Sequence, residues 1–120
     1  MQPAEGSGQA MSFAMRRAGD DVVLAVGGEM DLDNVEPLDS ALQELAATGE
    51  GAVVLDLSGV AFADSTTVNV LLRAHSALGP RLRLAALSPF MERLLGLIGL
   101  DGTLTVYRSV EDALAGVPAP

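Results

Sequence analysis

The sequence predicts an α/β fold: a single-domain two-layer sandwich with an N-terminal hairpin, a mostly parallel sheet of four to five strands, and about four helices on one face. Extended and helical patterns alternate in the order ββαβαβαβα, which is typical of βαβ units. The chain of 120 residues has room for one domain. Because the strands are expected to follow chain order across the sheet, no reversal creates a nucleotide cleft.

The first elements are a hairpin and a helix. Residues 11–18 and 21–26 are extended candidates joined by a Gly-Asp turn. The following helix has Asp33 or Asn34 as its expected N-cap and Gly49 as its expected end. Its apolar positions recur at steps of three and four: Val35, Leu38, Leu42 and Leu45.

A buried strand and a second helix come next. The apolar run 52–57 predicts a strand that ends at the Ser-Gly pair 58–59. The second helix is expected over 65–78, where Gly79 and a following proline stop it. Its expected apolar stripe is Val68, Leu71, Leu72, His75 and Leu78.

The C-terminal third repeats this alternation. Residues 82–86 predict a strand, and Ser88 followed by proline predicts the start of a third helix. A short strand over 104–107 and a final helix capped by Ser109 complete the domain. The third helix is expected to bury Met91, Leu94, Leu95 and Ile98.

Composition excludes several classes of function. The net charge of −9, with 16 acidic and 7 basic residues, disfavours nucleic-acid and anionic-membrane binding. No cysteine and a single histidine, His75, argue against a metal site, and we expect no cofactor. No apolar run reaches the roughly 18 residues of a membrane span, so a cytoplasmic location is expected. Flexible tails are expected at 1–10 and 118–120, around a domain at 11–117.

Two weaker candidates have simpler explanations. His75 lies on the predicted apolar stripe, and no Ser/His/Asp partner set is evident, so a packed core residue is the favoured interpretation. The acidic residues between Glu29 and Asp39 lack the glycine and terminal glutamate of a calcium loop. We interpret them as a solvated face or as charges that complement a helix N-terminus.

The start of the second helix is the most informative segment. Four consecutive residues, Asp64 to Thr67, can each cap a helix N-terminus, although one cap suffices. One interpretation is a cap beside ordinary polar surface. The other is a docking point or phosphoacceptor, because backbone N–H groups and the helix dipole at this position tolerate a phosphate.

Three segments, in this order and spacing, resemble a known family. They are Gly-Glu-Met-Asp-Leu at 28–32, Asp-Leu-Ser-Gly-Val at 56–60 followed by Asp-Ser-Thr-Thr at 64–67, and Leu-Ile-Gly-Leu-Asp at 97–101. The sequence resembles the STAS domain, and within it the anti-sigma factor antagonists, over residues 11–116.

This resemblance implies a phosphorylation-controlled partner switch that regulates transcription. The partner is an anti-sigma factor that is also an ATP-dependent serine/threonine kinase, and a serine/threonine phosphatase resets the modified form. Thr66 matches the family's phosphoacceptor, with Ser65 as the second choice. Asp31 and Asp64 match acidic residues at the partner-binding site, while Thr67 replaces the usual glycine and would be stiffer and bulkier at the contact surface.

Two alternatives remain open at this point. The domain could be a constitutive, non-phosphorylated STAS scaffold or a subunit of a larger complex. An enzyme or nucleotide-binding protein is disfavoured because the chain has no lysine and therefore no P-loop.

Overall fold

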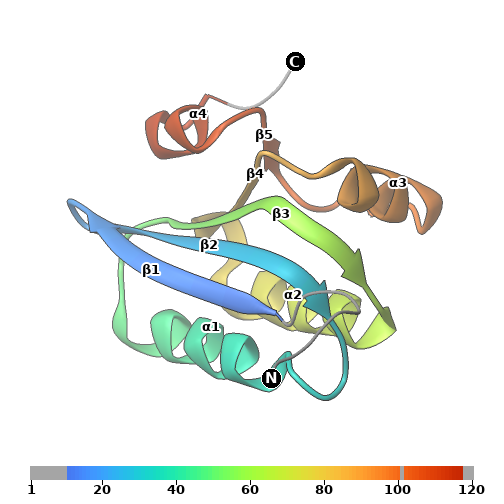
Figure 1. Ribbon diagram of the computed structural model, residues 1–120. Helices are drawn as coiled ribbons and strands as arrows, with labels where there is room; N and C mark the ends of the chain where they lie inside the picture. The colour runs from blue at the N-terminus through green and yellow to red at the C-terminus, as the bar shows by residue number, and fades with distance from the viewer. Residues whose placement is uncertain (1–10, 101, 118–120) are drawn as a thin grey trace, which may run out of the picture.

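The elements follow the predicted order. A computed structural model describes residues 11–100 and 102–117, so the expected tails lie outside the described residues. The chain runs through β1 (Ser12–Ala18), β2 (Asp21–Met30), α1 (Glu36–Thr48), β3 (Val53–Ala63), α2 (Ser65–Leu78), the short 3-10 helix η1 (Gly79–Arg81), β4 (Leu82–Ala85), α3 (Pro89–Leu97), β5 (Val106–Tyr107) and α4 (Val110–Ala115) (Figure 1).

The sheet confirms the predicted α/β fold. Its five strands lie in the order β1-β2-β3-β4-β5, with β1 antiparallel to β2 and every other pair parallel. The register places Leu24 beside Leu55, and Leu55 beside Leu84, across the three central strands. The strands lie across the sheet in the same order as in the chain, so the sheet contains no reversal of strand order, as predicted.

The main core lies between one face of the sheet and three helices. Alternate residues of the central strands, including Leu24, Leu55 and Leu84, point into this layer. The helices contribute buried side chains from α1, α2 and α3: Leu38, Leu42, Val70, Leu71, Ala74, Leu78, Met91 and Leu95.

The position of α4 differs from the expectation that all helices share one face. Ala113 of α4 is buried with Val23, Val54, Ala85 and Tyr107, whose side chains leave the sheet on the other side. Figure 1 shows α4 and the pair α1 and α2 on opposite sides of the sheet. Right-handed crossovers between parallel strands place their helices on one face of the sheet. Because α4 follows the last strand and belongs to no crossover, this preference does not constrain it.

Both strands that lead to the candidate site are longer than predicted. We expected them to end at Val26 and Leu57, but they continue to Met30 and Ala63. The register shifts beside Gly27, which pairs with Gly59. A Cβ added to Gly59 would lie 3.3 Å from the Gly27 Cα, so these glycines permit a close approach of two strands rather than a turn.

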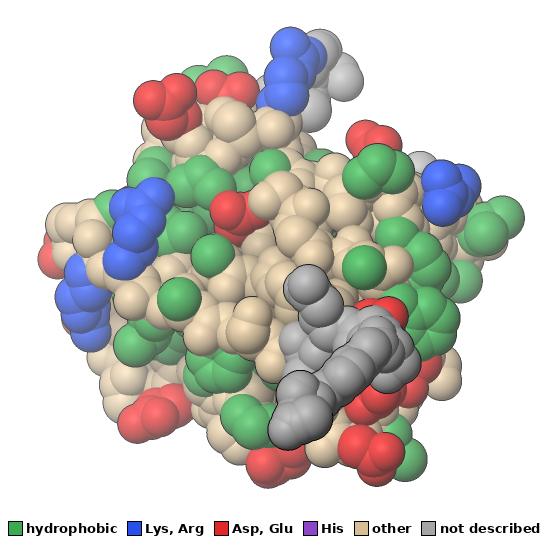
Figure 2. Space-filling model, in the orientation of Figure 1, with side chains coloured by type: hydrophobic (Ala, Val, Ile, Leu, Met, Phe, Trp, Pro, Cys, Tyr) green, Lys and Arg blue, Asp and Glu red, His purple; other side chains and the backbone are tan. Residues whose placement is uncertain are grey.

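The third helix exposes more apolar surface than predicted. Ile98 was expected in the core and is exposed, and the neighbouring Leu97 is 85% exposed. Figure 2 shows hydrophobic side chains gathered beside α3 on the right of the view. In residues 11–100 and 102–117, no helix combines the length and hydropathy needed to cross a bilayer.

Candidate functional site

The candidate site lies where β2 and β3 end side by side. Met30 pairs with Ala63 in the last step of the ladder, and the Asp64 amide then donates to the Met30 carbonyl at 3.3 Å. The loop 31–35 and the N-terminus of α2 follow directly. The parallel sheet therefore brings the predicted residue Asp31 and the segment 64–67 to the same end of the molecule.

Asp64 is the cap of α2. Its Oδ1 accepts a hydrogen bond from the Thr67 amide at 3.2 Å, which satisfies one of the free N–H groups of the first turn. Its Oδ2 accepts from the Leu32 amide at 3.2 Å. A single carboxylate thus binds two segments that are far apart in the sequence.

Thr67 is not at the contact surface where we expected it. Its side chain is fully buried, with 0% exposure. The hydroxyl donates to the Met30 carbonyl at 3.4 Å, and it lies 3.5 Å from Asp64 Oδ1. The residue in the family's glycine position therefore packs under the site and connects α2 to the end of β2.

The buried stripe of α2 explains this difference. It consists of Thr67, Val70, Leu71, Ala74 and Leu78, whereas the predicted stripe contained Val68, Leu72 and His75. Residues spaced by three and four positions form either stripe. The observed stripe begins with a polar residue, Thr67, and the predicted one with Val68, so hydrophobicity alone favoured the predicted stripe. The hydroxyl is compatible with burial because it hydrogen-bonds to the backbone.

Ser65 and Thr66 occupy the first turn of α2. Ser65 is exposed, and Thr66 is partly buried. The Thr67 amide is bonded to Asp64, whereas the Ser65 and Thr66 amides come too early in the helix to have an intrahelical acceptor, and the helix dipole places partial positive charge here. An oxyanion attached to either hydroxyl would therefore meet backbone donors close to it.

The loop after β2 is held by its own side chains. The Asp31 amide donates to Asn34 Oδ1 at 2.9 Å, and the Asp33 amide donates to Asp31 Oδ1 at 3.0 Å. Asn34 Nδ2 donates to the Glu29 carbonyl at 3.0 Å. Sequence reasoning placed the cap of α1 at Asp33 or Asn34, but the cap position is Val35, which makes no side-chain capping bond. Asn34 fixes the loop instead.

Sequence reasoning also missed the apolar side chains near this end of the sheet. Leu32 is 70% exposed, although Asp64 holds its backbone. Phe62, the penultimate residue of β3, is exposed and packs on Phe90 of α3 with ring centroids 5.4 Å apart. A signal was present in the sequence, since Leu32 stands between two aspartates and outside the helical periodicity.

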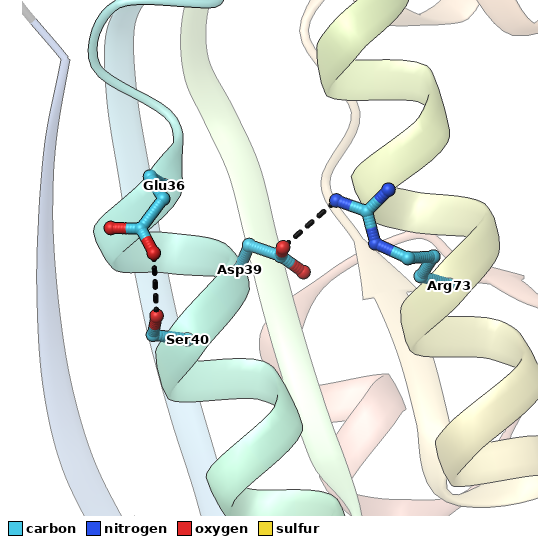
Figure 3. A network of polar contacts seen from close by, with 4 residues as sticks. All are labelled: Glu36, Asp39, Ser40 and Arg73. Carbon is cyan, nitrogen blue, oxygen red and sulfur yellow. Dashed lines mark hydrogen bonds and ion pairs between the residues drawn. The ribbon is translucent and has the colours of Figure 1, made fainter.

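The acidic residues between Glu29 and Asp39 make local contacts in the described part of the chain. Among the described residues, no group of three or more potential metal-ligating His, Cys, Asp or Glu side chains comes together. Asp39 on α1 instead pairs with Arg73 on α2 at 2.8 Å, and Glu36 accepts from the Ser40 hydroxyl at 3.2 Å (Figure 3). His75 is partly buried on α2.

The family assignment follows from a comparison of sequences. Residues 13–107 match a family model described as "Mlab, STAS domain". The chain belongs to the STAS domain family. This match covers every strand of the sheet except the first residue of β1, and it includes the candidate site.

Named relatives of this STAS domain are anti-sigma factor antagonists. The anti-sigma-F factor antagonist RsfB of Mycobacterium tuberculosis is 34% identical over 97 residues, which are 79% of this chain and 80% of RsfB. The crystal structure of an anti-sigma factor antagonist from Mycobacterium paratuberculosis has a TM-score of 0.81 at 29% identity, covering 90% of this chain and 94% of that one. The unphosphorylated form of SpoIIAA shares the fold, with a TM-score of 0.72 at 20% identity over 90% of this chain and 100% of SpoIIAA.

Proposed function

We propose that this STAS domain is an anti-sigma factor antagonist, which binds an anti-sigma factor and thereby frees a sigma factor for transcription. The observation that carries the proposal is the α2 N-terminus, where Ser65 is exposed and Thr66 partly buried beside the Asp64 cap. The names of the relatives at 34% and 29% identity support it. The domain acts by binding in the cytoplasm, without catalysing a reaction.

The partner-binding surface consists of the exposed and partly exposed members of the site. These are Asp31, Asp64, Ser65 and Thr66, while Thr67 supports them from below. All four lie at the end of the molecule where β2 and β3 end, so one partner face reaches them together. With a net charge of −9, the chain favours a partner whose contact face is basic.

Phosphorylation ends the interaction in this proposal. The anti-sigma factor transfers the γ-phosphoryl group of ATP to the Thr66 hydroxyl oxygen; the bond to the β-phosphate oxygen breaks, ADP leaves, and the hydroxyl proton is released. Ser65 is the second choice of acceptor. A serine/threonine phosphatase hydrolyses the phosphate ester and restores binding. Support comes from the solved phosphorylated form of SpoIIAA, which indicates that this fold accommodates a phosphate.

Incubation with candidate kinase-type anti-sigma factors and labelled ATP tests the phosphorylation step. Label is expected at Thr66, and Thr66→Ala should reduce it while leaving the partner complex intact. Phosphopeptide mapping that places the label outside Ser65 and Thr66 contradicts the assignment of the acceptor. Stable binding without any label supports the alternative, a constitutive STAS scaffold or subunit.

A further inference from the structure

One carboxylate connects the phosphoacceptor helix to an exposed leucine. Asp64 Oδ1 caps α2, which carries Ser65 and Thr66, and Oδ2 accepts a hydrogen bond from the Leu32 amide at 3.2 Å. No other side-chain hydrogen bond among the described residues links the loop 31–35 to α2. Any change that moves this carboxylate therefore changes how the Leu32 loop is held.

Leu32 has the properties of a preorganised contact. Its side chain is 70% exposed, yet its loop is held by Asp31 and Asn34 through their side-chain and backbone hydrogen bonds. An apolar side chain on a rigid loop loses little conformational entropy when a partner covers it. Apolar anchors of this kind supply much of the affinity of protein interfaces.

We propose that Leu32 is an apolar anchor for the partner, and that Asp64 is the positioning residue that couples Leu32 to the phosphorylation state of α2. The proposal rests on the proposed function, because it assigns a contact and a regulation to the same site. Asp31 and Asp33 flank Leu32, and Asp64 bonds its amide. The partner surface that fits this arrangement is an apolar recess with a basic rim.

The coupling follows from competition at the helix N-terminus. A phosphate on Ser65 or Thr66 carries about two negative charges and repels the Asp64 carboxylate. The free amides of the first turn are donors to this phosphate, which is the stronger acceptor. Asp64 then leaves the Leu32 amide, and the loop loses its connection to α2.

Amide exchange measured by NMR tests the coupling without any partner. Asp64→Ser keeps a capping oxygen for the Thr67 amide but leaves no second acceptor for Leu32. We expect the Leu32 amide to exchange at least about tenfold faster in Asp64→Ser and in a chain with phosphoserine encoded at position 66, because a lost hydrogen bond removes protection. The Leu71 amide, within α2, is the internal reference and should not change. An unchanged Leu32 exchange rate in the phosphorylated chain overturns the coupling.

Calorimetry with the cognate anti-sigma factor tests the anchor. Leu32→Ala should weaken binding by at least about tenfold, as truncation of an interface anchor does. Met15→Ala, which truncates an exposed apolar side chain on β1, is the matched control and should change affinity less than about twofold, as an apolar side chain outside the interface does. Asp64→Ser should weaken binding when Leu32 is present. It should weaken binding much less in the Leu32→Ala variant, because the effects of two coupled residues on binding free energy are not additive.

The outcomes separate this proposal from the function on which it rests. If phosphorylation abolishes binding while Leu32 exchange is unchanged, the coupling is wrong and the partner switch stands. If Leu32→Ala binds as tightly as Met15→Ala, the anchor is wrong. If no anti-sigma factor binds the unmodified chain, the proposed function and the anchor fail together, while the exchange measurement still decides the coupling.

Discussion

The three hydroxyl groups of the segment 64–67 differ in how accessible they are to a kinase. Thr67 is inaccessible, because its side chain is buried and its hydroxyl is bonded to the Met30 carbonyl. Ser65 and Thr66 remain as candidate acceptors in the proposed switch, and burial alone would favour Ser65. The choice of Thr66 therefore rests on its place in the family motif, and the substitutions at this residue are the decisive ones.

Thr66→Glu should weaken the complex with the anti-sigma factor strongly and leave the melting temperature almost unchanged. A negative charge in the first turn of α2 is tolerated by the helix dipole, whereas docking must desolvate it beside Asp64. A cost of about 3 kcal/mol corresponds to roughly a hundredfold loss of affinity. Calorimetry with wild type, Thr66→Glu and Thr66→Ala measures it. Equal affinities of the three proteins contradict the switch.

Substitutions of Thr67 separate its hydroxyl from its methyl group. Thr67→Val keeps the shape and removes the bond to the Met30 carbonyl, so the free energy of unfolding should fall by about 1 to 3 kcal/mol. Thr67→Ser keeps the hydroxyl and loses one methyl, with an expected cost of about 1 kcal/mol. Urea titrations of both variants measure these differences. A valine variant as stable as wild type would show that the hydroxyl does not contribute.

At the scale of elements, most of the fold was predictable because hydrophobic periodicity decides the type of each segment. Among the described residues, the number and order of α-helices and strands agree with the prediction, only the short η1 was not expected, and the caps at Ser88 and Ser109 are confirmed. The end of β3 was not predictable, because a Ser-Gly pair normally indicates a turn. Here the strand continues, since Gly27 of the paired strand β2 lies opposite Gly59. The position of α4 was not predictable from periodicity. It packs on the face of the sheet that α1, α2 and α3 leave uncovered.

The sequence also predicted which residues of the candidate site lie near one another. Asp31 and the segment 64–67 lie together because the sequence order of a parallel sheet brings strand ends to one edge. The roles of Asn34, Leu32 and Thr67 depend on individual hydrogen bonds and on helix rotation, which periodicity does not define. Sequence patterns therefore predict which segments lie together more reliably than they predict which contacts each side chain makes.

The end of α1 offers a test at this scale. Arg81 reaches from η1 to three backbone carbonyls: those of Leu45 and Ala46 on α1, and that of Gly51 before β3. Arg81→Lys keeps the charge but cannot reproduce this planar set of donors, so stability should fall by about 1 to 2 kcal/mol. Arg93→Lys, an exposed position on α3, is the control. Equal denaturation midpoints for the two variants would contradict a role for Arg81.

At the scale of the whole molecule, the charge is far from balanced. The net charge is −9, and a single ion pair between Asp39 and Arg73 is present in the described part of the chain. Repulsion among carboxylates therefore opposes the compact state, and dissolved salt screens it. In the proposed function, the same excess charge attracts a basic partner surface, so added salt should weaken partner binding while it raises stability.

Urea unfolding at two ionic strengths should show this dependence. Raising KCl from about 0.02 M to about 0.2 M shortens the screening length from roughly 20 Å to below 10 Å, so the midpoint of unfolding should rise. A midpoint that falls with added KCl would mean that attractive ion pairs outweigh the repulsion.

The equality of strand order and chain order affects how the molecule forms on the ribosome. Each strand pairs with the one synthesised just before it, from the β1–β2 hairpin to β5. Every pairing closes a loop no longer than one crossover, so no strand waits for a distant partner. The nascent chain, which emerges N-terminus first, can therefore add strands one at a time. The growing edge of the sheet is covered by the next strand to leave the tunnel, while β1 stays at the opposite edge.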